Sequence, residues 1–148
     1  MPSPPPAENA ERAGVADRVR FSVTDAADLG GAGGYDLVTI LEALHDMPRP
    51  VDALKAARQL ISEDGTLLVA DGLVAEEFTV PASPRERTEY GWSVVSCHPG
   101  AMGDPQTAAT GAVMRPSVLR QYALQAGFGE VEVLPIHTDY WRFYRLLR

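Results

Sequence analysis

The sequence is poor in cysteine and in positive charge. Cys97 is the single cysteine among 148 residues, so an internal disulfide is excluded, and we expect a reducing, cytoplasmic location. Acidic residues outnumber Lys and Arg by 20 to 13, which gives a formal net charge of -7. Because phosphate binding needs a basic surface, this balance argues against nucleic acid as a partner.

Long hydrophobic runs are also missing. No apolar stretch approaches the roughly 18 residues of a membrane-spanning helix, so no membrane partner is expected. The N-terminal MPSPPPAENAE lacks the basic start and apolar centre of a signal peptide. Its prolines predict an extended proline-rich tail over residues 1–6. Residues 7–148 are then long enough for a single domain with its own core.

The stretch from Tyr35 to Asp71 predicts a strand, a helix and a second strand. Tyr35–Leu41 is a short apolar run rich in branched residues, typical of a strand buried in a parallel sheet. Pro50 suits a first helical turn, and apolar residues recur after it at helical spacing. Asp64-Gly65 is predicted to end this helix before a strand at Thr66–Ala70. The stretch therefore predicts one βαβ unit.

Side chains with useful chemistry follow both of these strands. Glu42, His45 and Asp46 come after the first strand, and Asp71 ends the second. Open α/β sheets bind ligands at the carboxyl ends of their strands. A neutral imidazole is a base near neutral pH, and a carboxylate can orient it and stabilise its charged form. These residues are therefore the candidate chemical centre.

The flanking segments complete the predicted fold. Arg18–Val23 alternates as a strand does, after a short helix at Ala7–Ala13 that Gly14 can cap. Ser83-Pro84-Arg85-Glu86 has the spacing of a helix start. No periodicity is sustained over residues 96–114, which predicts a long loop. A helix at Pro116–Ala126 and a possible hairpin of strands complete the chain, the strands being Glu130–Ile136 and Tyr140–Leu147.

Aromatic residues and possible metal ligands also follow the central unit. Trp92, His98 and Met102 are candidates for lining an acceptor pocket, although a tryptophan on a helix also suits the core. The aromatic stripe from Tyr140 to Tyr144 is typical of strand packing. The neighbouring pair Cys97-His98 has no second ligand pair at a useful spacing, so no metal site is predicted.

Taken together, three stretches resemble the class I S-adenosylmethionine-dependent methyltransferases. They are ENAERAGVADRVRFSVTDAADL, YDLVTILEALHDMPRPVDALKAARQLISEDGTLLVAD and LRQYALQAGFGEVEVLPIHTDYWRFYRLL. The resemblance implies a Rossmann-like, three-layer α/β sheet with a C-terminal antiparallel strand pair. In this sheet Tyr140–Leu147 is expected to lie antiparallel beside Thr66–Ala70, with Glu130–Ile136 at the outer edge. The strands Arg18–Val23, Tyr35–Leu41 and Thr66–Ala70 are expected to be parallel. It implies S-adenosylmethionine as cofactor, with Asp25 and Ala26 beside the adenine and Leu41 and Glu42 facing its methionine part.

The segment LHDMPRP is similar to the His-Asp-Trp-x-Asp-Glu motif of small-molecule O-methyltransferases. In that motif the histidine is the general base that takes the proton of an acceptor hydroxyl. The resemblance therefore implies that His45 is the base and that Asp71 flanks it. Met47 stands in place of the tryptophan, and Arg49-Pro50 in place of the acidic pair.

The family's glycine-rich cofactor turn and its first two strands have no counterpart here. Gly30 to Gly34 is no substitute, because the GxGxxG spacing fails and a strand follows. The chain thus resembles a partial methyltransferase domain that is incomplete at the N-terminus. Three explanations remain open: a fragment of a longer protein, a misread gene start, and a naturally reduced protein. We expect weak cofactor binding by the chain alone. Without the two missing strands, Arg18–Val23 is expected to pair directly with Tyr35–Leu41, or a second chain is expected to fill the gap between them. The expected partner is therefore a second copy of this chain, as in a homo-oligomer, or a missing N-terminal half.

Two functions follow from the sequence. The first is methyl transfer from S-adenosylmethionine to a hydroxyl of a small molecule. The second is a non-catalytic remnant that self-associates or binds another chain. A nicotinamide-dependent short-chain dehydrogenase is excluded, because the required Tyr-x-x-x-Lys pair is missing: the single lysine, Lys55, follows Val51 at that spacing.

Overall fold

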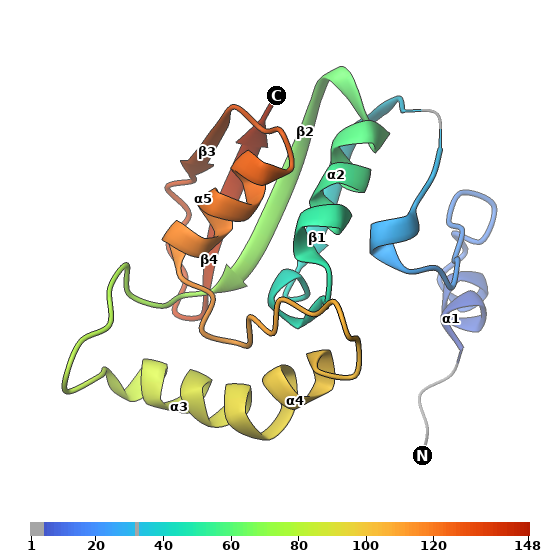
Figure 1. Ribbon diagram of the computed structural model, residues 1–148. Coiled ribbons are helices and arrows are strands. Elements are labelled where there is room, and N and C mark those ends of the chain that lie inside the picture. The colour runs from blue at the N-terminus through green and yellow to red at the C-terminus, as the bar shows by residue number, and fades with distance from the viewer. Residues whose placement is uncertain (1–4, 32) are drawn as a thin grey trace.

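The fold is built on an open four-stranded sheet, seen in a computed structural model that describes residues 5–31 and 33–148 (Figure 1). The strand order is β1-β2-β4-β3. The strands are β1 (Tyr35–Leu41), β2 (Ile61–Gly72), β3 (Glu130–Val133) and β4 (Trp141–Leu147). β1 and β2 are parallel, and β4 runs antiparallel to both β2 and β3. Ala70 lies opposite Phe143, which confirms the predicted pairing of the last strand with Thr66–Ala70.

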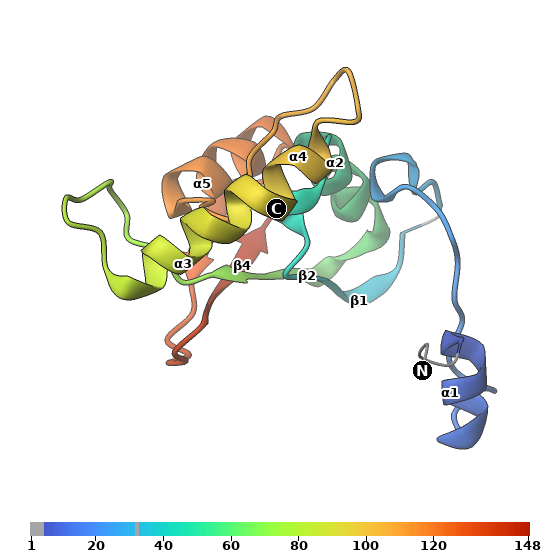
Figure 2. The same ribbon diagram turned by 90° about the horizontal axis from the view of Figure 1, so that it is seen from below.

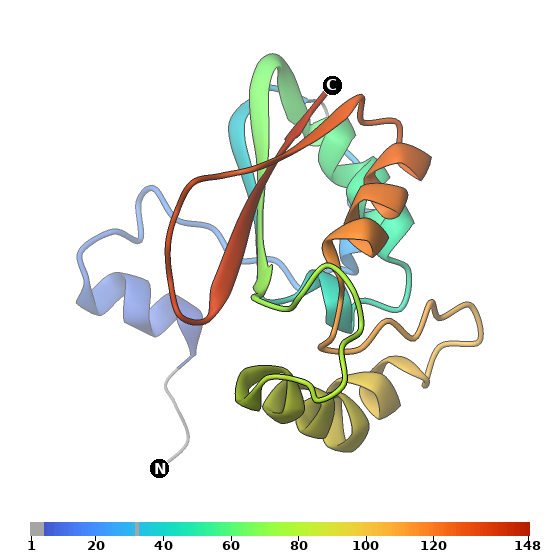
Figure 3. The ribbon, with the colours of Figure 1, turned by 90° about the vertical axis from the view of Figure 1, so that its left-hand side faces the viewer.

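One face of the sheet is covered by α2 (Pro50–Leu60) and α5 (Pro116–Gln125), as Figures 2 and 3 show. The fully buried side chains of this layer come from both helices and from the central strands: Leu54, Leu119, Leu67, Val69 and Leu146. Each contributes roughly 1.5–3 kcal/mol through removal of its apolar surface from water. This helix-on-sheet core fixes the carboxyl ends of β1 and β2, where the candidate residues lie.

The described residues supply one of the two helical layers of a three-layer arrangement. Leu37 and Leu41 project from the other face of β1 and are 55% and 57% exposed. The remaining N-terminal helix, α1 (Pro6–Arg12), stands away from the sheet in Figures 2 and 3. It begins at Pro6, the last residue assigned to the tail, and Gly14 follows it with a left-handed φ of 66° as expected of a helix cap. Residues 1–4 of the predicted tail lie outside the described residues.

The predicted strand at Arg18–Val23 is wrong. These residues form no strand, and Phe21 and Val23 are exposed. A strand forms only where a neighbouring strand accepts and donates its backbone hydrogen bonds. An alternating pattern of side chains does not provide that neighbour. The segment also does not move across to pair with β1, whose outer edge has no partner strand among the described residues.

The predicted boundary between helix and second strand also needs correction. α2 ends at Leu60, and β2 starts directly at Ile61 rather than after Asp64-Gly65. A Cβ atom on Gly65 would lie 2.5 Å from the Tyr35 carbonyl oxygen. The register of β1 and β2 shifts at this point, between Tyr35 and Leu37. Gly65 therefore permits a close approach of two strands and does not stop the helix.

The segments beyond β2 follow the predictions in part. α3 (Pro84–Trp92) starts where its capping motif indicates, and Ser83 Oγ accepts the Glu86 N–H at 3.1 Å. The helix continues through a π-helical turn, η3 (Ser93–Cys97), into α4 (His98–Ala101), so the predicted loop over residues 96–114 begins only after Ala101. β3 ends at Val133, earlier than predicted. In the described part of the chain no helix combines the length and apolarity needed to cross a membrane.

Candidate active site

A pocket of about 400 Å³ lies at the carboxyl ends of β1 and β2, beneath α3. Two of the sequence candidates, Glu42 and His45, line it, as does the candidate acceptor residue Trp92. The other lining residues come from α3, from η3 and the loop before α5, and from the ends of β2 and β4: Arg85, Thr88, Glu89, Cys97, Ala112, Gly72, Tyr140 and Trp141. The pocket therefore lies at the edge of the sheet where the sequence predicted chemistry.

The backbone turns sharply into this pocket directly after β1. Glu42 has a left-handed φ of 49°, which costs a residue with a side chain roughly 1–2 kcal/mol. Its N–H still donates to the Ala70 carbonyl at 2.9 Å, as a continuation of the β1–β2 ladder. Burial, with the charge of Asp71 added, raises the pKa of the Glu42 carboxyl. The turn directs the chain into the short helix η2 (Leu44–Asp46), which carries His45.

His45 and Asp71 form a buried pair. His45 Nδ1 lies 2.8 Å from Asp71 Oδ1, and the residues are 6% and 1% exposed. Because a carboxylate can only accept, the imidazole donates from Nδ1, and its Nε2 carries the lone pair. The same Asp71 oxygen accepts the Gly72 N–H at 2.8 Å, which fixes the carboxylate in place. The structure thus brings together two residues that the sequence separates by 26 positions.

This pair gives His45 the properties of a positioned base. Burial acts to lower the pKa of His45, but the hydrogen bond and charge of Asp71, with the charges of Asp46 and Glu42, outweigh it and raise that pKa. An imidazole of raised pKa holds a proton more firmly once it has accepted it. The arrangement can therefore accept a proton at Nε2 and stabilise the resulting imidazolium.

The candidate acceptor residues divide into one inside the pocket and two outside it. Trp92 lines the pocket. His98 Nδ1 instead donates to the Ala109 carbonyl at 2.9 Å, and Met102 lies exposed in the turn after α4. Neither of these two is among the lining residues.

Sequence reasoning missed an ionic and aromatic wall of the pocket. Arg85 and Glu89, one turn apart on α3, form an ion pair of 2.7 Å. The Arg85 guanidinium also lies 4.5 Å from the centre of the Tyr140 ring and donates to the Tyr140 carbonyl at 3.0 Å. Tyr140 and Trp141 belong to the stripe interpreted as strand packing, yet their half-exposed rings line the pocket, whereas Tyr144 is buried in the core. The spacing of four residues between Arg85 and Glu89 was the signal in the sequence that could have indicated this wall. The same spacing equally fits an ion pair on the exposed face of a helix.

The candidate cofactor residues occupy two neighbouring places. Asp25 accepts the Ala27 N–H at 2.9 Å and the Arg49 guanidinium at 2.9 Å, which together lower its pKa. Arg49 also binds Asp28 at 2.9 Å, so a residue that departs from the family motif anchors the 25–28 turn to the start of α2. Ala26 and Leu41 line a separate, mainly apolar hollow of about 200 Å³ between this turn, β1 and α2. An apolar hollow of this kind suits the flat face of an aromatic base.

Comparison with known proteins agrees with this architecture. The proteins that match this chain are O-methyltransferases, and the match covers the C-terminal part of their chains. The erythromycin 3''-O-methyltransferase of Saccharopolyspora erythraea is 34% identical over an alignment of 154 positions, which covers 90% of this chain and 44% of that enzyme. The chain therefore spans less than half the length of this curated relative. No protein-family model matches the chain.

Solved structures show the same fold. Mitomycin 7-O-methyltransferase is 21% identical with a TM-score of 0.67, over 95% of this chain and 37% of that one. An O-methyltransferase family protein from Burkholderia thailandensis is 16% identical with a TM-score of 0.66, over 95% and 39%. An O-methyltransferase of neocarzinostatin biosynthesis, solved with S-adenosyl-L-homocysteine and 1,4-dihydroxy-2-naphthoic acid, is 20% identical with a TM-score of 0.65, over 95% and 37%. These matches confirm the predicted Rossmann-like fold, and the chain spans only part of the length of each of these proteins.

Proposed function

We propose that this chain forms the acceptor-side part of an S-adenosylmethionine-dependent methyltransferase acting on a hydroxyl of a small molecule. The observation that carries the proposal is the buried His45–Asp71 pair, with a 2.8 Å hydrogen bond, at the wall of a pocket. The relative from Saccharopolyspora, by its name, methylates an oxygen of erythromycin, and a structural neighbour was solved with 1,4-dihydroxy-2-naphthoic acid, a small molecule that carries hydroxyl groups.

In the proposed reaction, bound S-adenosylmethionine would supply an electrophilic methyl group to the oxygen of the acceptor. His45 Nε2 accepts the proton of the acceptor hydroxyl as its oxygen forms the new bond to carbon. Asp71 holds the imidazole in the tautomer that leaves Nε2 free and stabilises the imidazolium that results. The remaining catalysis is positioning of the acceptor by the pocket walls.

The described residues fit part of this cofactor. The Ala26–Leu41 hollow would take the adenine, and Glu42 would face the sulfonium end from the neighbouring pocket. Asp25 would contribute through the turn that it shapes, because Arg49 engages its carboxylate. A glycine-rich turn with free N–H groups for the carboxylate of the cofactor is absent from residues 5–31 and 33–148, so a further polypeptide segment must supply those donors.

The test of the proposal is methyl transfer by a completed domain. The purified chain is mixed with the part of the Saccharopolyspora enzyme that it does not match, and transfer of labelled methyl to a panel of small hydroxyl compounds is measured. His45→Ala should reduce turnover by roughly 100-fold or more, the usual scale for a general base. His137→Ala, in the exposed loop between β3 and β4, is the matched control.

The pH dependence separates a base from a merely structural histidine. A base is active when deprotonated, so turnover should rise with pH through the raised pKa of His45. Asp71→Asn removes the charge that raises this pKa, so the acidic limb should move to lower pH while the maximal rate falls. Near-normal turnover of His45→Ala across the pH range would remove His45 from the mechanism.

A second candidate function is a partner-binding module without catalysis of its own. The observation that favours it is the outer edge of β1, which pairs with no strand among the described residues and carries exposed Tyr35, Leu37 and Leu41. Measurement of cofactor binding distinguishes the two candidate functions. A chain that associates tightly with a partner, yet gives a complex that binds no S-adenosylmethionine, is a module of the second kind.

A further inference from the structure

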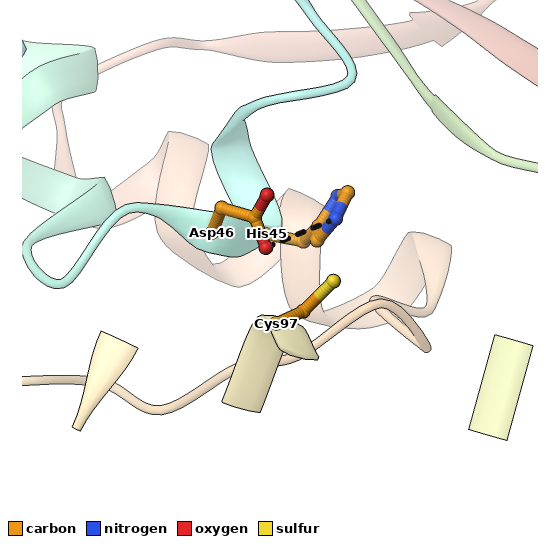
Figure 4. Close-up of side chains that lie close together, drawn as sticks. All are labelled: His45, Asp46 and Cys97. Carbon is orange, nitrogen blue, oxygen red and sulfur yellow. Dashed lines mark ion pairs between the residues drawn. The ribbon is translucent and has the colours of Figure 1, made fainter. Parts of the chain in front are cut away.

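Three side chains with metal-binding atoms meet beside the pocket, as Figure 4 shows: His45, Asp46 and Cys97. Their ligand atoms all lie within 4.8 Å of one another, and His45 Nε2 is 3.3 Å from Asp46 Oδ1. His45 and Asp46 belong to η2, whereas Cys97 is supplied by the π-helical turn η3. The sequence predicted no metal site because it paired Cys97 with His98; spacing along the chain does not reveal ligands that the fold brings together.

The hydrogen bonding of His45 leaves a place for a positive charge in this cluster. Asp71 accepts the Nδ1–H, so the neutral imidazole presents a lone pair at Nε2. That lone pair faces a carboxylate oxygen of Asp46, which is also an acceptor. Two acceptors at 3.3 Å repel each other unless a cation or a proton lies between them.

The donor set indicates which cations fit. One imidazole nitrogen, one carboxylate oxygen and one thiolate match the mixed ligands of zinc, which takes three protein ligands and leaves a fourth position open in sites of the catalytic type. Zinc-bound ligand atoms lie roughly 3.3–3.6 Å apart, so the His45–Asp46 spacing of 3.3 Å fits, and the Cys97 sulfur, within 4.8 Å of both atoms, would move closer on binding. The buried Asp71 behind Nδ1 is the carboxylate that commonly orients a metal-binding histidine.

We propose that His45 Nε2, an Asp46 oxygen and Cys97 Sγ bind a divalent cation of the zinc class. Binding releases the Cys97 thiol proton to solvent, and the fourth position opens into the pocket that His45 and Cys97 line. The cation occupies the lone pair that the proposed base needs, so it inhibits methyl transfer. Metal binding itself does not depend on the proposed function.

The proposal is tested on the purified chain after chelator treatment, without cofactor or acceptor. Calorimetry with Zn²⁺ should give one site per chain, and titration with Co²⁺ should produce the charge-transfer absorption of a cobalt–thiolate bond. Cys97→Ser should abolish this absorption. His45→Gln and Asp46→Asn should each weaken Zn²⁺ binding at least about 10-fold, and Asp71→Asn, which acts through His45, by roughly 10–100-fold.

His137→Gln is the matched control and should bind Zn²⁺ as the unaltered chain does; circular dichroism shows that each variant is folded. A Co²⁺ spectrum without a thiolate band would overturn the proposal, as would unchanged Zn²⁺ affinity in Cys97→Ser or His45→Gln. Because binding is measured without methyl transfer, a failure of the proposed function leaves this result unaffected.

Discussion

At the residue scale, the His45–Asp71 pair connects the proposed chemistry with the stability of the fold. Both side chains are buried, and Asp71 Oδ2 has no hydrogen-bond partner, so the bonds that Oδ1 accepts from His45 Nδ1 and from the Gly72 N–H stabilise this carboxylate. The charged form of His45 is favoured in the folded chain, because the surrounding carboxylates raise its pKa above the ordinary 6.5. Folding and protonation of His45 are therefore linked.

The linkage predicts a pH-dependent contribution to stability. For a histidine of raised folded pKa, the contribution is fully present below the unfolded value of 6.5 and is lost as pH rises through the folded pKa. The melting temperature of the unaltered chain should therefore exceed that of His45→Gln most at about pH 6 and least at about pH 9. Differential scanning calorimetry across this range measures the difference. A gap that widens with rising pH would contradict the assigned direction, and His137→Gln is the control.

At the element scale, Arg115 ties three segments together around the pocket. Its guanidinium donates to the carbonyls of Ala75 and Glu77 after β2, to Glu86 Oε1 on α3 at 3.1 Å, and to the Tyr90 hydroxyl at 2.9 Å. Glu86 is 3% exposed, so Arg115 rather than water is the partner of its carboxylate. Arg115 thereby holds α3, the roof of the pocket, against the start of α5.

Replacement of Arg115 should destabilise the chain strongly. Arg115→Met leaves the buried Glu86 carboxylate unpaired, which costs about 3–5 kcal/mol in the free energy of unfolding. Arg120→Met is the matched control, because its pair with Glu76 at 3.3 Å is exposed and is worth about 0–1 kcal/mol. Urea denaturation measures both. The double variant Arg115→Met with Glu86→Gln should recover part of the loss; equal effects of Arg115→Met and Arg120→Met would refute this role.

The elements that the sequence predicted well are those whose signals are local. The start of α3 at its serine cap and α5 with its proline start depend on neighbouring residues, and both lie where expected. The pairing of β1, β2 and β4 could be predicted from the family order. The strand at Arg18–Val23 could not be judged locally, because alternation shows which side chains suit a sheet and not whether a neighbouring strand is present.

The same distinction applies to the candidate site. His45 and Asp71 could be placed together because both follow parallel strands, whose carboxyl ends meet at one edge of the sheet. Arg49 could not be assigned, since its contacts with Asp25 and Asp28 bridge more than 20 positions and carry no motif. Cys97 and the aromatic wall reach the pocket only through the packing of η3 and the turn before β4. Because these contacts form only when the chain folds, the sequence pattern alone does not predict them.

At the scale of the whole molecule, the open sheet predicts weak cofactor binding and self-association of the isolated chain. Within residues 5–31 and 33–148 no strand pairs with the outer edge of β1, and apolar side chains beside this edge are exposed. Calorimetry should detect S-adenosylmethionine binding weaker than micromolar or none, and light scattering should give a mass above that of one 16.0 kDa chain. A monomer that binds the cofactor at micromolar strength would contradict both expectations.

Leu37→Lys tests whether β1 is the surface responsible for this association. A charge at this exposed position discourages strand addition and should shift the light-scattering mass towards the monomer. Leu124→Lys, which changes an equally apolar residue that is 70% exposed on α5, is the control and should leave the mass unaltered. Equal effects of the two substitutions would assign the association to general surface apolarity.

The unpaired edge of β1 also has a consequence for the amount of this protein in a cell. Chaperones and proteases remove chains that expose such edges, and small changes in the population of vulnerable states alter abundance several-fold. A polypeptide that covers β1 would protect the chain from degradation. We therefore expect the cellular half-life of this protein to increase with the concentration of that partner. The partner would then control the abundance of this protein.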